Sequence, residues 1–170
     1  MTTKLFFDIL INMENNVNNS IIEQLNSEGI ISFVPTGNSM WPTLKHKGQS
    51  VVVQKKQQRL SKFDVALYLD KSGALVLHRV LRVVDGGYVT RGDSQVKTES
   101  VPENNVIGVM LGFYQKNEYV DVNSEEYILK ISKWLNNERK RVRKINRFYF
   151  TQKVKGKLKK LFGKKGNKNV

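Results

Sequence analysis

The first 29 residues carry apolar side chains at the spacing of an amphipathic helix. From Leu5 to Leu25 the apolar positions recur at gaps of one, three and four residues, which places them on one side of a helix. The pattern predicts one helix, or two short ones, over residues 4–25. We expect this segment, 1–29, to cover one face of a core; a helix that binds a partner is the alternative.

From Ile30 the pattern changes to short apolar runs rich in β-branched residues, which are typical of strands. The runs that predict strands are 30–34, 50–53, 65–69, 75–84, 88–90, 106–113 and 119–122. Turn-forming residues separate them, and 70–73 and 85–87 are typical hairpin connections. No long helical pattern intervenes to let parallel strands cross over. The sequence therefore predicts a mainly β domain over 30–122, built as a curled antiparallel sheet.

The last segment, 123–170, is a basic helical tail. Apolar residues from Ile128 to Tyr149 fall on one helical stripe, while lysine and arginine fill most other positions. Past Gly156 the same pattern continues among lysines. We expect 163–170 to be disordered, because it combines charge and glycine with almost nothing to bury.

The net positive charge of the chain comes from this tail. Residues 1–129 hold 13 Lys/Arg against 14 Asp/Glu and carry a net charge of −1. Residues 130–170 hold 16 against one and carry +15, which together give the formal charge of +14. An anionic membrane surface fits a basic helix with an apolar stripe. Packing of the tail on the domain is one alternative, and nucleic acid is the less favoured partner. The candidate contacts are Arg139, Lys140, Arg141, Arg143, Lys144 and Arg147.

The composition of the chain excludes several kinds of catalytic and metal site. The chain has no cysteine, which excludes disulfides, thiolate metal sites and a cysteine nucleophile. Two histidines, His46 and His78, are too few for a typical all-histidine zinc site. We expect neither a metal nor a cofactor, and a site of mixed histidine and carboxylate ligands is the alternative. The apolar run at 5–11 is broken by Asp8, and no stretch approaches the roughly 20 apolar residues of a membrane span. We therefore expect a cytoplasmic protein, peripheral on the membrane, with any covalent chemistry on serine or threonine.

The segment 36–44 reads TGNSMWPTL and lies between a predicted strand and a glycine turn. It resembles the Ser-Met-x-Pro-Thr-Leu box of type I signal peptidases. The match covers five positions: Ser39, Met40, Pro42, Thr43 and Leu44. The resemblance implies a barrel-like β catalytic fold, with Ser39 as a nucleophile activated by a base elsewhere in the chain. The alternative is that Ser39 caps a turn and its neighbours fill a core.

His78 lies in the predicted strand 75–84, 39 residues after Ser39. A lone histidine on an apolar strand is more often a buried core residue than a catalyst. However, His78-Arg79-Val80 resembles the endoplasmic-reticulum-type branch of the family, in which histidine replaces the catalytic lysine. Imidazole has an unperturbed pKa of about 6.5 and is already mostly neutral near pH 7, so it can accept a proton there. We expect His78 to be the general base.

The segment Gly92-Asp93-Ser94 resembles the Gly-Asp-Asn box of the family, with serine in place of asparagine. The family's usual downstream Asp-Ser-Arg pattern is missing. Because the predicted hairpin at 85–87 turns the chain back, we expect Asp93 to orient the base through its second ring nitrogen. A turn without a catalytic role is the alternative, since these residue types favour turns.

Four residues around the nucleophile complete the predicted site: Gly37, Asn38, Met40 and Pro42. Because Gly37 offers no hydroxyl, we expect the backbone N–H of Ser39 to stabilise the oxyanion. The resemblance implies a serine endopeptidase that forms an acyl-enzyme and cuts a signal or leader peptide from a precursor after small residues. The alternative is a catalytically idle peptidase-like domain that binds peptides or a membrane surface.

Overall fold

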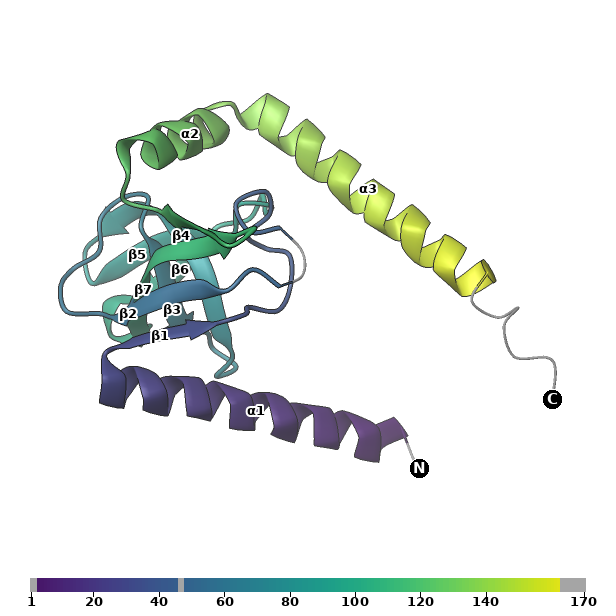
Figure 1. Cartoon of the computed structure of the whole chain (residues 1–170), viewed down its shortest axis with the longest axis horizontal. Coiled ribbons are helices and arrows are strands. Elements are labelled where there is room, and N and C mark those ends of the chain that lie inside the picture. Colours follow the sequence, from purple (N-terminus) through teal and green to yellow (C-terminus); the bar gives the residue numbers. More distant parts are fainter. Residues whose placement is uncertain (1–2, 46–47, 163–170) are drawn as a thin grey trace. The chain divides into compact units, whose positions relative to one another are not determined.

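The computed structural model of the chain describes residues 3–45 and 48–162 (Figure 1). His46 and the segment 163–170, which was expected to be disordered, lie outside the described residues. The chain divides into two compact units, Met1–Ser132 and Lys133–Val170. The first unit contains the N-terminal helix, the sheet and the first part of the helix that follows it.

A single long helix, α1 (Thr3–Glu28), spans the N-terminal segment. It ends at Gly29, which adopts a positive φ of 75° and donates its N–H to the carbonyl of Leu25 at 3.1 Å. A glycine in the left-handed region is a common way to end a helix, because it has no Cβ to clash. Leu25 is buried, so the last turns of α1 pack on the sheet. The first unit, which holds the sheet, is called the sheet unit below.

The body of the first unit is one eight-stranded antiparallel sheet, with the strand order β1-β2-β7-β3-β4-β5-β6 and β8 paired with β7. The strands are β1 (Ile30–Phe33), β2 (Val51–Lys55), β3 (Val65–Leu69), β4 (Leu75–Val84), β5 (Gly87–Arg91), β6 (Glu99–Pro102), β7 (Val106–Gln115) and β8 (Glu118–Asp121). A 3₁₀ turn, η1 (Glu103–Asn105), joins β6 to β7. The prediction of a mainly β antiparallel fold with helices at both ends is confirmed.

The sheet is open and is not closed into a barrel as the resemblance implied. Within the described residues, β1 pairs only with β2, and β6 pairs only with β5. The two end strands, each four residues long, are therefore not hydrogen-bonded to one another. The hairpins expected at 70–73 and 85–87 are confirmed, since β3 pairs with β4 and β4 with β5.

A buried apolar cluster forms part of the core and shares Tyr68 with the candidate site. It draws on β3 to β7 and on the segment before β3: Leu60, Ala66, Tyr68, Val80, Tyr88, Val101 and Val106. Because Tyr68 belongs both to this cluster and to the site described below, core packing fixes one of the site's polar groups.

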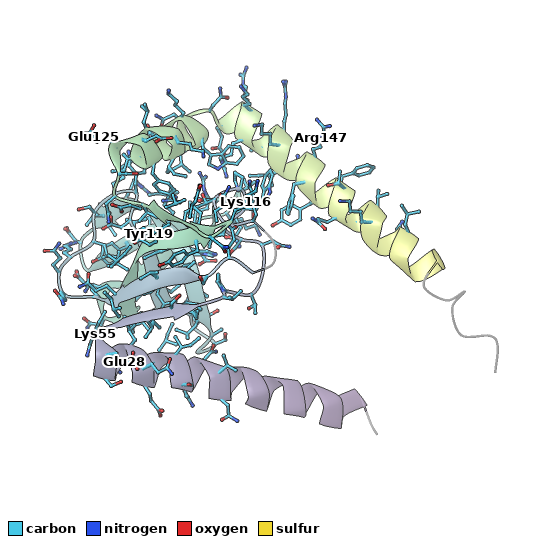
Figure 2. All side chains as sticks on the ribbon, in the orientation of Figure 1. Glu28, Lys55, Lys116, Tyr119, Glu125 and Arg147 are labelled. Atoms are coloured by element: carbon cyan, nitrogen blue, oxygen red, sulfur yellow. The ribbon has the colours of Figure 1, made fainter. Side chains whose placement is uncertain are left out.

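The basic tail forms two helices, α2 (Glu125–Asn136) and α3 (Glu138–Phe162), rather than one continuous stripe. The break lies at Asn137, whose side-chain oxygen accepts a hydrogen bond from Lys140 N at 3.1 Å and caps the start of α3. In Figure 2 side chains of α3 are drawn as sticks, with Arg147 labelled among them. No helix in the described ranges has the length and apolar character needed to cross a bilayer.

Candidate functional site

A cavity of about 1230 Å³ in the first unit brings together the two residues that sequence reasoning paired. Ser39 and His78 both line it. The remaining walls come from α1, the segment after β1, and strands β3, β4 and β6. Small-molecule pockets typically hold about 300–1,000 Å³, so this cavity has room for several residues of an extended peptide.

The backbone around Ser39 is held by the segment 92–94. Ser94 donates its N–H to the Ser39 carbonyl at 2.8 Å, and its single hydroxyl proton is shared between the carbonyls of Asn38 at 2.8 Å and Ser39 at 3.0 Å. Gly92 approaches so closely that a Cβ there would lie 2.7 Å from Ser39 O and 2.9 Å from Ser39 Cβ. The predicted Gly-Asp-Ser segment therefore clamps the candidate nucleophile in place.

The segment 36–44, which carries Ser39, is called the serine loop. Some of its other residues line the cavity and some do not. Gly37, with a positive φ of 88°, and the buried Met40 line the cavity beside Ser39. Asn38 accepts a hydrogen bond from Trp41 N at 3.0 Å through its carbonyl and so forms the turn. Pro42 lies in the same loop, outside the part that lines the cavity.

His78 projects from β4, opposite Ala66 of β3, and is almost fully buried. Its Nδ1 lies 3.0 Å from Tyr68 Oη and 3.3 Å from Glu99 Oε2. Tyr68 in turn donates its hydroxyl proton to Glu99 Oε2 at 2.5 Å. A tyrosine, a histidine and a carboxylate from β3, β4 and β6 thus form one polar cluster at the cavity wall.

This cluster favours one tautomer of the imidazole. An ionised carboxylate only accepts hydrogen bonds, and the single proton of Tyr68 is directed to Glu99. Nδ1 of His78 therefore faces two acceptor oxygens and is best placed to carry the ring proton. The Nε2 lone pair is then left to accept a proton. No hydrogen bond joins Nε2 to Ser39 Oγ within the part of the chain that the structure describes.

Burial and the nearby carboxylate act in opposite directions on His78. Burial lowers the pKa of His78 below its ordinary value of about 6.5, and the negative charge of Glu99 partly opposes that shift. Burial, together with the hydrogen bond to Glu99, raises the pKa of Tyr68 far above its ordinary range. Both groups are accordingly neutral near pH 7, with the imidazole in the form that can act as a base.

Asp93 is engaged in a separate buried cluster with Arg79. The guanidinium donates from Nε to Oδ1 at 2.8 Å and from Nη2 to Oδ2 at 2.7 Å, and neither side chain is exposed. Thr43 also donates to Oδ2 of Asp93. Tyr127 Oη and the Phe63 carbonyl accept from the other guanidinium protons at 3.0 and 2.8 Å. This network ties the serine loop, β4, the 92–94 segment and α2 together.

The structure therefore divides the three residues expected to be catalytic. It brings Ser39 and His78 to one cavity, and it shows both oxygens of Asp93 bonded to Arg79. The orienting role of Asp93 stays a prediction. The carboxylate found in contact with the His78 ring is Glu99, which sequence reasoning missed. Its available signal was an acidic residue six positions after Asp93, in a short polar strand that the apolar pattern did not reveal.

The basic residues singled out in the tail all lie in α3 and differ in their surroundings. Arg141 pairs with Glu138, with Nη2 2.6 Å from Oε1, and Lys144 Nζ lies 5.8 Å from the centre of the Trp134 ring. The others are exposed: Arg139, Lys140, Arg143 and Arg147.

In the described ranges no group of three or more His, Asp or Glu side chains could hold a metal ion. Comparison of the chain with protein-family models, with curated proteins and with solved structures gave no significant match. Any assignment of function therefore depends on the arrangement of the residues themselves and on the resemblance of short motifs.

Proposed function

We propose that the chain is a serine endopeptidase in which Ser39 is the nucleophile, His78 the general base and Glu99 the carboxylate that orients it. The observation that carries the proposal is the position of His78. His78 lines the same cavity as Ser39, while its Nδ1 lies against Tyr68 and Glu99. Nucleophile, base and orienting acid are the three parts that a serine hydrolase needs.

In the proposed reaction, Ser39 Oγ attacks the peptide carbonyl as its proton passes to Nε2 of His78. The resulting imidazolium is stabilised by the carboxylate of Glu99 and returns the proton to the leaving amine as the C–N bond breaks. Water, deprotonated by the same imidazole, then hydrolyses the acyl-enzyme. In unliganded enzymes the hydrogen bond between nucleophile and base is often long and shortens only when substrate binds. The absence of a hydrogen bond between Ser39 and His78 is compatible with that behaviour.

The proposed substrate is a precursor protein carrying a signal or leader peptide. The motif resemblance to type I signal peptidases supports a preference for small side chains before the cut. The cavity supports an extended substrate, because its walls include the strands β3, β4 and β6 and its volume of about 1230 Å³ can hold several residues. In this proposal Asp93 and Ser94 are positioning residues, since they hold the serine loop.

The test is cleavage of a proteome-derived peptide library, with new termini mapped by mass spectrometry. We expect the wild-type chain to produce a common cleavage pattern that disappears in both Ser39→Ala and His78→Ala. Circular dichroism and thermal unfolding of the two variants serve as the folding control, and both should match the wild type.

Two outcomes would overturn the proposal. One is the same cleavage pattern in Ser39→Ala as in the wild type. The other is binding of peptides without any cleavage by the wild-type chain, which would support the idle, peptide-binding alternative.

A further inference from the structure

The distal part of α3, residues 149–158, carries exposed side chains around its own helix. Each described residue from Tyr149 to Leu158 is exposed. Among them are large apolar side chains, with exposed fractions of 68% for Phe150, 39% for Val154 and 46% for Leu158. Isolated helices of this length are marginal in water, and helices usually gain stability by packing an apolar face. Within its own unit, no described residue covers the side chains of Phe150, Val154 and Leu158.

The three apolar residues form a single stripe. Phe150, Val154 and Leu158 are four positions apart, and residues at that spacing lie one above the other on a helix surface. Lys153 and Lys157 lie along one flank of this stripe, and Lys155 lies along the other. We refer to Phe150, Val154, Leu158 and these three lysines as the distal face of α3.

The charge around the distal face has one sign. After Glu138 no acidic residue occurs in the sequence up to Val170. The lysine side chains are long enough to direct their ammonium groups away from the apolar stripe and toward an anionic layer beside it. An apolar stripe flanked by lysines is the arrangement of helices that lie in the interface of an anionic bilayer.

We propose that the distal face of α3 binds the surface of a bilayer containing anionic lipids. A bilayer accounts for both halves of the pattern, because its headgroups attract the lysines and its acyl region accepts the stripe. Nucleic acid accounts for the charge alone. Valine and leucine cannot stack on bases as aromatic side chains do, so two of the three stripe residues would have no role there.

The experiment is flotation of the full-length chain with vesicles of phosphatidylcholine containing phosphatidylglycerol, and with vesicles of phosphatidylcholine alone. Binding to the mixed vesicles should exceed binding to the neutral ones and weaken as salt is raised. The combined variant Phe150→Ala, Val154→Ala, Leu158→Ala removes the stripe but keeps a strong helix former at each position. It should bind the mixed vesicles about tenfold more weakly or worse.

Matched variants test the lysines of the distal face separately from its apolar stripe. Lys153→Gln, Lys155→Gln, Lys157→Gln should weaken binding about 100-fold at low salt. The controls are Val83→Ala, Val84→Ala, two exposed valines of β4, and Lys55→Gln, Lys97→Gln, Lys116→Gln, three exposed lysines of the sheet unit. Both controls should bind as the wild type does.

Binding of the chain to a duplex DNA of about 30 base pairs is measured as well, to test nucleic acid as the partner. The variant Ser39→Ala separates membrane binding from the proposed peptidase activity. The proposal predicts that loss of the stripe leaves any DNA binding unchanged, and that Ser39→Ala binds vesicles normally. It is overturned if the alanine stripe variant floats with mixed vesicles as well as the wild type does, or if the wild-type chain binds DNA but not vesicles.

Discussion

His78 and Arg79 are neighbours in the sequence but meet different carboxylates, and the alternation of a strand explains why. Successive side chains of a strand point to opposite faces. His78 accordingly faces Tyr68 and Glu99 at the cavity, while Arg79 faces Asp93 on the other side of β4. A spacing argument along the chain could not choose between the two carboxylates, because both follow His78 on the returning chain.

At the scale of single residues, the first prediction concerns Glu99→Gln. Loss of the carboxylate removes the charge that opposes burial, so the pKa of His78 should fall further below its ordinary value. The acid limb of kcat/KM should move to lower pH, because the base then stays neutral in more acidic solution. The plateau should fall on the order of 100-fold or more, since the imidazolium formed during attack loses its counter-ion.

The pH profile and NMR titration of the His78 ring measure these two effects separately. A His46→Gln background leaves a single histidine signal. An unchanged titration of His78 in the Glu99 variant would contradict the assignment of Glu99 as its partner.

The second prediction is that Asp93→Asn acts mainly on stability. Removing one charge of a fully buried pair leaves the other without compensation, and such changes cost about 3–5 kcal/mol. The free energy of unfolding from urea titration should fall by about 3 kcal/mol or more. The exposed Glu118→Gln is the control and should change it by less than about 0.5 kcal/mol. A stable Asp93 variant with strongly reduced activity would instead support the orienting role predicted from sequence.

At the scale of elements, the long or strongly patterned segments could be predicted and the short polar one could not. β3 and β4 have the bounds expected from their apolar runs, and the other predicted strands differ by one or two residues at their ends. β6 reads ESVP, with a glutamate and a proline in four residues, so it has no strand signal of its own. Proline is tolerated there because β6 is an edge strand that pairs only with β5. Missing β6 also meant missing Glu99, which is its first residue.

The clamp between the 92–94 segment and the serine loop gives the third prediction. In Gly92→Ala the new Cβ would lie within 3 Å of the Ser39 backbone and side chain, so the loop must shift. We expect a loss of about 1–3 kcal/mol of stability. Cleavage should fall about 100-fold, because a displacement near 1 Å at a nucleophile costs that much.

Gly156→Ala, measured in the same unfolding and cleavage assays, is the matched control. Gly156 lies within α3, and apart from its chain neighbours and the backbone of its own helix no heavy atom lies within 4 Å of an added Cβ. Alanine there should favour the helix by about 0.5–1 kcal/mol and leave cleavage unchanged. If Gly92→Ala behaved like this control, the clamp would have no part in positioning Ser39.

For the whole molecule, charge and candidate chemistry reside in different parts of the chain. Residues 1–129, which include the cavity, hold 13 basic and 14 acidic residues, whereas residues 130–170 hold 16 and one. Salt should therefore affect the two proposed activities differently. Raising NaCl from about 0.05 to 0.5 M should change cleavage of a short uncharged peptide by less than about twofold while releasing the chain from anionic vesicles. A parallel loss of both activities would mean that the basic helices also serve the cavity.

The central claim is that His78 activates Ser39, and labelling with a fluorophosphonate tests it most directly. The full chain would be reacted over a range of pH, and the adduct mapped by tandem mass spectrometry. The account predicts one adduct, on Ser39, whose rate of formation falls as His78 becomes protonated and which is lost in His78→Ala. An adduct on another residue, a rate that is unchanged in His78→Ala, or no adduct at all would contradict it.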